Sequence, residues 1–350
     1  SAYHTFEMLR PHLPGKNLLQ IPQSAVYFHP HADLYKNTTL QPHISPLMGK
    51  QNWYAEAATA AQKTDLDLIG WTVFLHNSYQ AQKHPECAEV TCTGDISTHH
   101  LCPANTAVRS YACALARDLA QNYGIAALEC ESLSFGGFGH THYHVKYGVN
   151  LGSGGRFLLS LCFCKACHKI GQDANLDTGA LCQALHNKIR TAFETGAPVQ
   201  ESPEELAASI PDLYAYLICR EQIATSLFTQ VQEAAAIPVS FIYMGSPSIT
   251  GVNRNQISTL ADYVEILSYT ADPDRTRQTI ADCMADLSSP EQLMVGLQAY
   301  PPASPTVDAL IANLEAAIGM GIQKFSFYNY GIMPLSNLGW VKQALECRVT

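Results

Sequence analysis

Short apolar runs alternate with helical segments along much of this chain, and this alternation limits the possible folds more than any other feature. In the C-terminal half, helices or turns separate runs that are rich in apolar, β-branched and aromatic residues. The runs lie at 237–244, 263–269, 292–300 and 322–330, and the clearest helices are predicted over 276–287 and 306–320. Because each helix carries the chain back to start the next strand in the same direction, the pattern predicts parallel βαβ units and an α/β fold.

Three further strand-like runs lie in the N-terminal half, at 24–31, 66–76 and 125–131. Between the last two, Asn105 can cap a helix over 106–123, where apolar residues recur at helical spacing. Seven strands at this spacing predict a (β/α)8 TIM barrel, one strand short, as a single domain over residues 1–350. Long insertions are then expected at about 77–104 and 133–204, after strands 3 and 4.

The first strand of such a barrel is missing or irregular in the sequence. We expect it either just before Tyr3 or at 18–21. A doubly wound open sheet is the alternative fold. No glycine-rich phosphate loop follows a predicted strand in the required context, which argues against a dinucleotide-binding fold.

Composition excludes some partners. The chain has 350 residues, 47% of them hydrophobic, and a formal net charge of −9. Without a basic run, nucleic acid and anionic membranes are poor candidate partners, and no apolar stretch approaches the roughly 20 residues of a membrane span. The twelve cysteines cluster and do not resemble the framework of a small secreted domain. We therefore expect a reducing, cytoplasmic setting with free or metal-bound thiols; the oligomeric state is left open.

The stretch 125–144 combines a buried strand with reactive side chains. Glu129 and Glu131 lie two positions apart and should share a face of the strand. A glycine-rich turn and three histidines follow: His140, His142 and His144. Acids at the carboxyl end of a barrel strand lie where such barrels place their chemistry. Glu131, nearer that end, is the first catalytic candidate and Glu129 the second; the alternative is that Glu131 caps the next turn.

Cleavage of a glycosidic bond commonly requires two carboxyl groups. Asp272 is the best candidate for the second, because it follows the strand at 263–269. An alternative stays open, since the sequence Ala-Asp-Pro-Asp-Arg is also typical of a turn, with Asp272 before Pro273 and Asp274 able to cap the helix that follows.

Polar and aromatic side chains follow nearly every predicted strand. In a barrel these loops meet at one face, where aromatic rings stack on a sugar and polar groups bind its hydroxyls. The predicted substrate-binding residues are His4, His29, His76, Asn77, His142, His144, Tyr269, Gln298, Tyr300, Tyr328 and Asn329. The expected substrate is a small molecule or an oligosaccharide.

A run of cysteines suggests a metal site. Cys162, Cys164, Cys167 and His168 supply four zinc-type ligands within seven residues. Ligands so close in sequence rarely all reach one tetrahedral ion, so a further cysteine is needed. The candidates for it are Cys182, Cys87, Cys92 and Cys102. The alternative is that the cysteines are small apolar core residues. A structural zinc is thus a possible cofactor, and the catalytic chemistry requires none.

His29-Pro30-His31 follows an early strand and is similar to the metal-binding motif of amidohydrolase barrels. Those barrels usually carry an aspartate after the last strand, where this chain has Phe-Tyr-Asn-Tyr-Gly-Ile-Met. The missing aspartate argues against an amidohydrolase. A metal-dependent hydrolase or lyase that uses His29, His31 or the histidines at 140–144 is kept as an alternative function.

Several segments together resemble a largely uncharacterised bacterial family of TIM-barrel, glycoside-hydrolase-like proteins. In addition, the Cys-Pro-x-Asn-x-x-Val-Arg-x-Tyr pattern at 102–111 resembles the segment before the fourth strand of glycosidase-like barrels. The resemblance covers residues 3–167 and implies that the next strand delivers an active-site carboxylate, which would be Glu131. The segments are found at 3–12, 25–35, 70–78, 101–111, 128–135 and 158–167.

These features together predict a carbohydrate-active enzyme of the glycoside hydrolase type. Besides the metal-dependent hydrolase, a non-catalytic sugar-binding barrel remains an alternative. It predicts that only one carboxylate lines the cleft.

Overall fold

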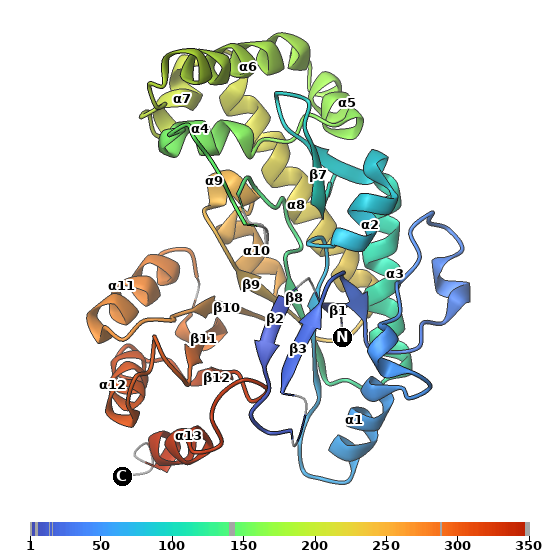
Figure 1. The fold of residues 1–350 in the computed structure, drawn as a ribbon, viewed down its shortest axis with the longest axis vertical. Coiled ribbons are helices and arrows are strands. Elements are labelled where there is room, and N and C mark those ends of the chain that lie inside the picture. The colour runs from blue at the N-terminus through green and yellow to red at the C-terminus, as the bar shows by residue number, and fades with distance from the viewer. Residues whose placement is uncertain are drawn as a thin grey trace. The chain divides into compact units, whose positions relative to one another are not determined.

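The computed structural model describes residues 2–3, 6–13, 15, 17–139, 144–287 and 289–346. The chain folds into two compact units, which are described separately. Unit 1 comprises Ser1–Thr5, Gln23–Pro238 and Gly245–Asn253, and unit 2 comprises Phe6–Pro22, Val239–Met244 and Arg254–Thr350. Figure 1 shows their helices and strands. None of the helices described is both long and apolar enough to cross a lipid bilayer.

Unit 1 is built around two parallel strands and the helix that connects them. Strands β5 (Ile69–Val73) and β8 (Ala127–Glu131) pair in register from Ile69 opposite Ala127 to Val73 opposite Glu131. Helix α3 (Thr106–Asn122) begins where predicted, because the Asn105 side chain accepts hydrogen bonds from the N–H groups of Ala107 and Val108. Helix α1 (Trp53–Gln62) is capped by Asn52 in the same way.

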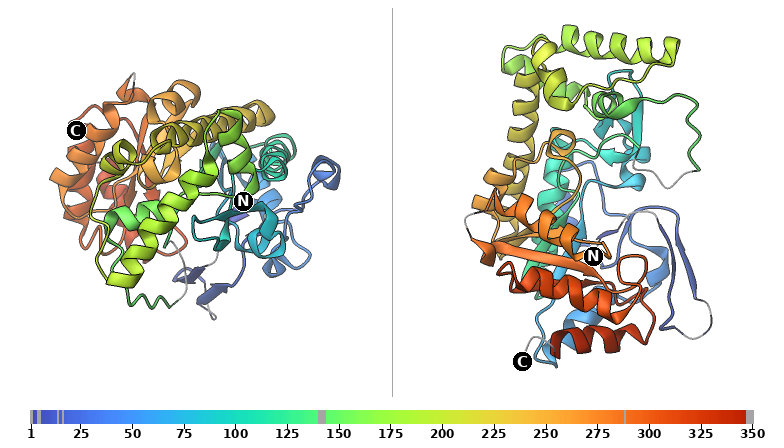
Figure 2. Two further views of the ribbon diagram at one scale, coloured as in Figure 1. Left: turned by 90° about the horizontal axis from the view of Figure 1, so that it is seen from above. Right: turned by 90° about the vertical axis from the view of Figure 1, so that its left-hand side faces the viewer.

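The two insertions form most of the rest of unit 1. The first holds α2 (Ser78–Lys83), η3 (Pro85–Cys87) and an antiparallel ribbon of β6 (Ala88–Val90) and β7 (Ile96–Leu101). The second holds α4 (Gly152–Leu159), α5 (Lys165–Asp173), α6 (Thr178–Thr195) and α7 (Pro203–Ser209). Figure 2 shows these helices gathered around the start of α8 (Leu213–Ala235), over an apolar core. The short helix α9 (Pro247–Thr250) also belongs to unit 1.

Helices α7 and α8 follow each other closely in the chain, separated only at residues 210–212. The break between them follows from Pro211, because proline disfavours the helical conformation in the residue before it. Ile210 is accordingly extended, with φ −101° and ψ 120°, and Asp212 takes the left-handed conformation at φ 64°.

Unit 2 contains the four C-terminal strands in the predicted positions. These are β9 (Val239–Tyr243), β10 (Tyr263–Leu267), β11 (Leu293–Gln298) and β12 (Lys324–Tyr328), each parallel to the next. Helices α10 (Arg254–Leu260), α11 (Pro273–Met284) and α12 (Val307–Ile318) connect them, η4 (Pro290–Gln292) precedes β11, and α13 (Asn337–Glu346) follows β12. Helices α11 and α12 lie side by side (Figure 1).

The six parallel strands follow one another in the sheet in chain order: β5, β8, β9, β10, β11, β12. A doubly wound sheet reverses its strand order at a switch point, so this order is that of a barrel wall. The described residues form six strands of such a wall rather than a closed barrel of eight. The proposed single domain is not tested by this arrangement and stays a prediction.

Two sequence-based expectations about the first strands are wrong. The run at 24–31 contributes only the two-residue β4 (Ala25–Val26), which pairs antiparallel with β1 (Ala2–Tyr3) instead of joining the parallel sheet. The run at 18–21 is β3 (Leu18–Ile21), and it pairs antiparallel with β2 (Phe6–Leu9) in a local ribbon. After β4 the chain forms two short turns of helix, η1 (Ala32–Tyr35) and η2 (Pro46–Met48).

Candidate functional site

Glu131 ends strand β8 and has a defined hydrogen-bond partner. Its side chain is 9% exposed, and Oε2 accepts a hydrogen bond of 2.7 Å from the indole Nε1–H of Trp71 on β5. The sheet register explains the pairing: Trp71 lies opposite Glu129, so Glu131 is its diagonal neighbour on the same face. Strand and indole together therefore hold this carboxylate at the carboxyl end of a parallel strand.

The other predicted residues near this strand end have structural partners. Glu129 is partly buried within β8. His76 is 4% exposed, and Asn77 caps α2 by accepting a hydrogen bond of 3.0 Å from the N–H of Gln80. Asn77 therefore has a helix-capping task, and its predicted contact with substrate stays a prediction.

The His-Pro-His motif is tied to a buried acid. His31 Nδ1 lies 2.8 Å from Oδ1 of Asp118, which is fully buried and also accepts from the Tyr35 hydroxyl. Within the described residues, His29, His31 and His144 belong to no group of three or more converging ligand atoms. His4, His140 and His142 lie outside the described residues.

Unit 1 also contains a cavity of about 420 Å³ between the β6–β7 ribbon and the segments that follow β8. Its lining includes Glu89, His99, His100, Phe138 and Cys162. The Glu89 side chain is 7% exposed, and Oε1 accepts a hydrogen bond of 2.8 Å from the N–H of Gly136. Burial raises the pKa of Glu89 to about 7, although the Gly136 N–H and the Arg220 charge act in the opposite direction. A carboxyl with this pKa can exchange a proton near neutral pH.

Gly136 must be glycine for this arrangement to form. A Cβ at this position would lie 2.0 Å from Nδ1 of His100. The missing side chain thus lets the chain after β8 approach β7 closely enough to hydrogen-bond Glu89.

The acids of unit 2 are used differently. Asp272 is exposed and is the N-cap of α11, with Oδ1 accepting a hydrogen bond of 2.9 Å from the N–H of Asp274. Glu265 is 3% exposed within β10, and its carboxylate accepts a hydrogen bond from the Ser326 hydroxyl on β12. The predicted turn and capped helix are present, but the N-cap is Asp272 rather than Asp274, which lies in the first turn of α11. The cap does not by itself test a catalytic role for Asp272, which stays a prediction.

Three of the predicted substrate-binding tyrosines come together in unit 2. The rings of Tyr269 and Tyr328 stack with centroids 5.4 Å apart, and the Tyr300 ring lies 6.4 Å from that of Tyr328. Tyr269 follows strand β10, Tyr300 follows β11, and Tyr328 is the last residue of β12. Burial, and then the neighbouring Tyr328, raise the pKa of Tyr300 to about 12. Nearby, Gln298 Nε2 donates to the Pro301 carbonyl oxygen at 3.1 Å, and Asn329 follows Tyr328.

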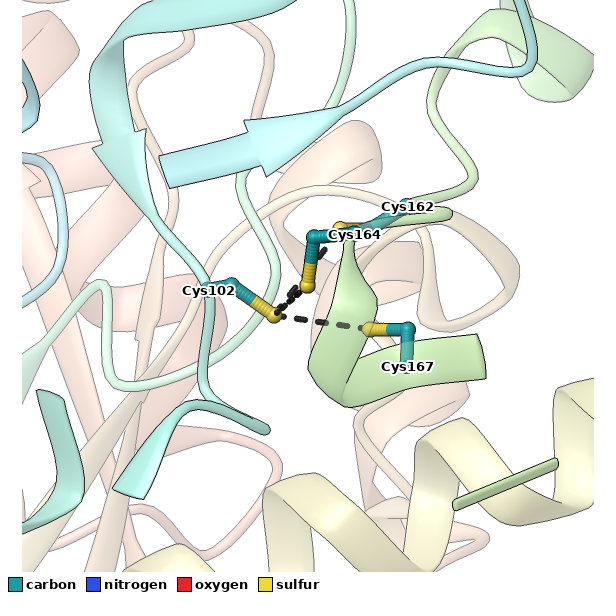
Figure 3. Close-up of side chains that lie close together, drawn as sticks. All are labelled: Cys102, Cys162, Cys164 and Cys167. Carbon is teal, nitrogen blue, oxygen red and sulfur yellow. Dashed lines mark hydrogen bonds between the residues drawn. The ribbon is translucent and has the colours of Figure 1, made fainter. Parts of the chain in front are cut away.

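Four cysteines converge between the two insertions of unit 1 (Figure 3). The Sγ of Cys102 lies 3.4 Å from that of Cys164, 3.4 Å from that of Cys167 and 3.8 Å from that of Cys162. All four are buried, free thiols. His168 lies outside the group, with Nδ1 2.9 Å from the Thr178 hydroxyl. Cys102 therefore completes the group of four.

Sequence reasoning missed Glu89 as a functional candidate. It lies in a three-residue strand within an insertion, and its cavity is lined by segments up to about a hundred residues away. The available signal was weak: a single acid between the apolar residues Ala88 and Val90.

No protein-family model matches the chain, and no curated protein matches it by sequence. Solved structures do resemble it in fold. The glycoside hydrolase domain of PgaB (BpsB) from Bordetella bronchiseptica superposes with a TM-score of 0.57 at 13% identity, over 93% of this chain and 82% of that one.

Two other glycoside hydrolases superpose comparably. The catalytic domain of β-amylase from Paenibacillus polymyxa has a TM-score of 0.54 at 12% identity, over 86% of this chain and 87% of that one. The β-galactosidase of the psychrophilic Marinomonas ef1 has the same score and identity, over 87% of this chain. The matched region spans only 53% of the β-galactosidase. At these identities the likeness establishes a glycoside-hydrolase-like fold and no activity.

Proposed function

We propose that this chain is a carbohydrate-active enzyme of the glycoside hydrolase type and that Glu131 is a catalytic carboxylate. The observation that carries the proposal is the placement of Glu131: nearly buried, at the carboxyl end of a parallel strand, and bound to the Trp71 indole. Barrel enzymes collect their chemistry at these strand ends. The fold shared with glycoside hydrolases supports the same reading.

The indole of Trp71 gives Glu131 one N–H donor and no cation. One carboxylate oxygen is thereby oriented by a neutral group, with its direction fixed by two paired strands. A carboxylate oriented in this way can act on a glycosidic bond as nucleophile or as acid/base.

The reaction needs a second carboxyl group in most such enzymes. Asp272, proposed from the sequence, is exposed and caps α11. Glu89 offers a buried carboxyl whose pKa is raised to about 7, which suits a general acid. Both are candidates, and their neutral amide variants distinguish them. In unit 2, the group Tyr269, Tyr300 and Tyr328 is proposed to stack against a sugar ring.

The test is turnover of a panel of nitrophenyl glycosides and unmodified oligosaccharides. On any substrate that the wild type cleaves, Glu131→Gln is expected to lower kcat by a factor of about 10²–10⁴ while the melting temperature changes little. Glu56→Gln, which removes an exposed glutamate of α1, is the control and should keep most of the activity. Glu129→Gln tests the second candidate on the same strand. Glu131→Gln with wild-type turnover would contradict the proposal.

Chelator and binding experiments separate the other function classes. Brief exposure to a weak chelator, too mild to strip metal from buried cysteines, is expected to leave turnover intact, because His29, His31 and His144 belong to no group of converging ligand atoms. If oligosaccharides bind with measurable affinity but none is cleaved, and Glu131→Gln binds them equally well, the chain is a sugar-binding barrel and the catalytic proposal is wrong.

A further inference from the structure

The group Cys102, Cys162, Cys164 and Cys167 has the dimensions of a tetrahedral metal site. In a tetrahedron with zinc–sulfur bonds of about 2.3 Å, neighbouring sulfur atoms lie about 3.8 Å apart. The sulfur of Cys102 lies 3.4–3.8 Å from the other three, and all four sulfur atoms lie within 4.8 Å of one another. These separations are far longer than the roughly 2.05 Å bond of a disulfide.

The backbone around the cysteines supplies a hydrogen bond of the kind that metal-bound thiolates accept. The Val90 N–H donates to the Cys162 sulfur at 3.4 Å. Cys164 is the N-cap of α5 and Cys167 lies in its first turn, where the helix dipole favours negative charge. Outer hydrogen bonds of this kind orient the ligands of metal sites.

We propose that these four cysteines bind one structural zinc ion that joins the two insertions of unit 1. Cys102 follows the β6–β7 ribbon, whereas the other three lie at the turn from α4 into α5, 60 to 65 residues later. With four thiolates as its ligands, the ion has no position open to water. Such a closed site is typical of structural rather than catalytic zinc.

The ion would also fix one wall of the cavity that contains Glu89. Cys162 lines that cavity. The N–H of the adjoining Phe163 donates to the Val90 carbonyl oxygen at 2.6 Å, and the Val90 N–H donates to the Cys162 sulfur. Both backbone polar groups of Val90 on β6 are therefore bound to the segment that contains the cysteines. Val90 is the immediate neighbour of Glu89. The zinc would thus position Glu89 without touching it.

Metal analysis of the full chain tests the proposal directly. The protein is purified without a histidine tag, in reducing buffer, and its metals are measured by mass spectrometry. About one zinc per chain is expected, and Cys102→Ser or Cys164→Ser should lose it. Two matched controls should keep it: Cys113→Ser, which removes a thiol of α3 outside the group, and His168→Ala, which removes the adjacent histidine.

A second measurement covers the case in which the serine variants fail to fold. Zinc is removed from the wild type with a chelator in reducing buffer, which should lower the Tm by about 5 °C or more, and equimolar zinc should restore it. A folded, reduced wild type that neither contains zinc nor takes it up would overturn the proposal. Zinc that remains in Cys102→Ser but leaves in His168→Ala would overturn the assignment of the fourth ligand.

Discussion

The two units of this chain differ in how they use their acidic side chains. In unit 1, Glu131 and Glu89 are nearly buried, and each accepts a hydrogen bond from a neutral N–H group: the Trp71 indole and the Gly136 backbone. In unit 2, Asp272 is exposed and caps a helix, and Glu265 links two strands through Ser326. What unit 2 presents at its strand ends is instead a group of tyrosine rings.

This difference shows that a position after a strand does not by itself make an acid a catalytic candidate. A cap carboxylate bonds to the first turn of a helix, a task that asparagine performs equally well. A carboxyl buried beside a cavity, such as that of Glu89, carries a desolvation cost that its hydrogen bond to a backbone N–H does not offset, which makes it the stronger candidate for function. Exchanging these acids one at a time tests whether the two units differ in this way.

The largest effect is expected at Glu89, as a change of stability with pH. Its pKa in the folded protein, about 7, lies above the ordinary value of 4.5. Between these values the folded chain holds a proton that the unfolded chain releases. The stabilisation is therefore complete below pH 4.5 and lost as the pH rises through 7. The free energy of unfolding of the wild type, relative to Glu89→Gln, should fall by about 3 kcal/mol over this range.

Urea unfolding at several pH values between 4 and 8 measures this difference. Glu56→Gln is the control, because it removes an exposed glutamate of α1 in the same unit and shows the general effect of one lost charge. The difference in unfolding free energy between the wild type and Glu89→Gln could instead stay constant with pH. Glu89 would then be a structural acid like those of unit 2, and the contrast between the units would disappear.

A smaller effect is expected where the chain after β8 approaches β7. Gly136→Ala would place a Cβ 2.0 Å from the His100 ring, so one of the two segments must move. Overpacking of this kind costs about 1–3 kcal/mol. Gly148→Ala is the matched control, because a Cβ there meets nothing within 4 Å and the residue is exposed. Equal unfolding free energies for the two variants would show that the Glu89 cavity is loosely built.

The sequence predicted those parts of the fold in which each segment carries its own signal. Strand β9 is buried at all five positions, and all of its residues except Ser240 are apolar or aromatic, as expected of a strand covered on both faces. The start of helix α3 could be predicted from its N-cap residue, Asn105. The prediction that residues 18–21 could form a strand of the main sheet was wrong, because β3 pairs with the neighbouring β2. No local pattern distinguishes a short ribbon from a strand of the main sheet.

The candidate site divides in the same way. The position of Glu131 at the end of a parallel strand was predictable because the strand and its acid are adjacent in sequence, and its catalytic role stays a prediction. The set of cysteines was only partly predictable: three lie within six residues, whereas Cys102 comes from another insertion and was one of several open choices. Glu89 could not be singled out, because its burial depends on segments distant in the chain.

The smallest effect is expected at Asp272, where it separates helix capping from catalysis. Asp272→Ala removes the acceptor for the Asp274 N–H and should cost about 1 kcal/mol of unfolding free energy. Asp272→Asn keeps an acceptor at the N-cap and should unfold like the wild type. If Asp272 serves only α11, Asp272→Asn also keeps wild-type kcat on any glycoside that the wild type cleaves. A fully stable Asp272→Asn with kcat lowered by a factor of about 10² or more would instead make Asp272 the second carboxyl group of the reaction. That result would mean that an acid of unit 2 also takes part in the reaction.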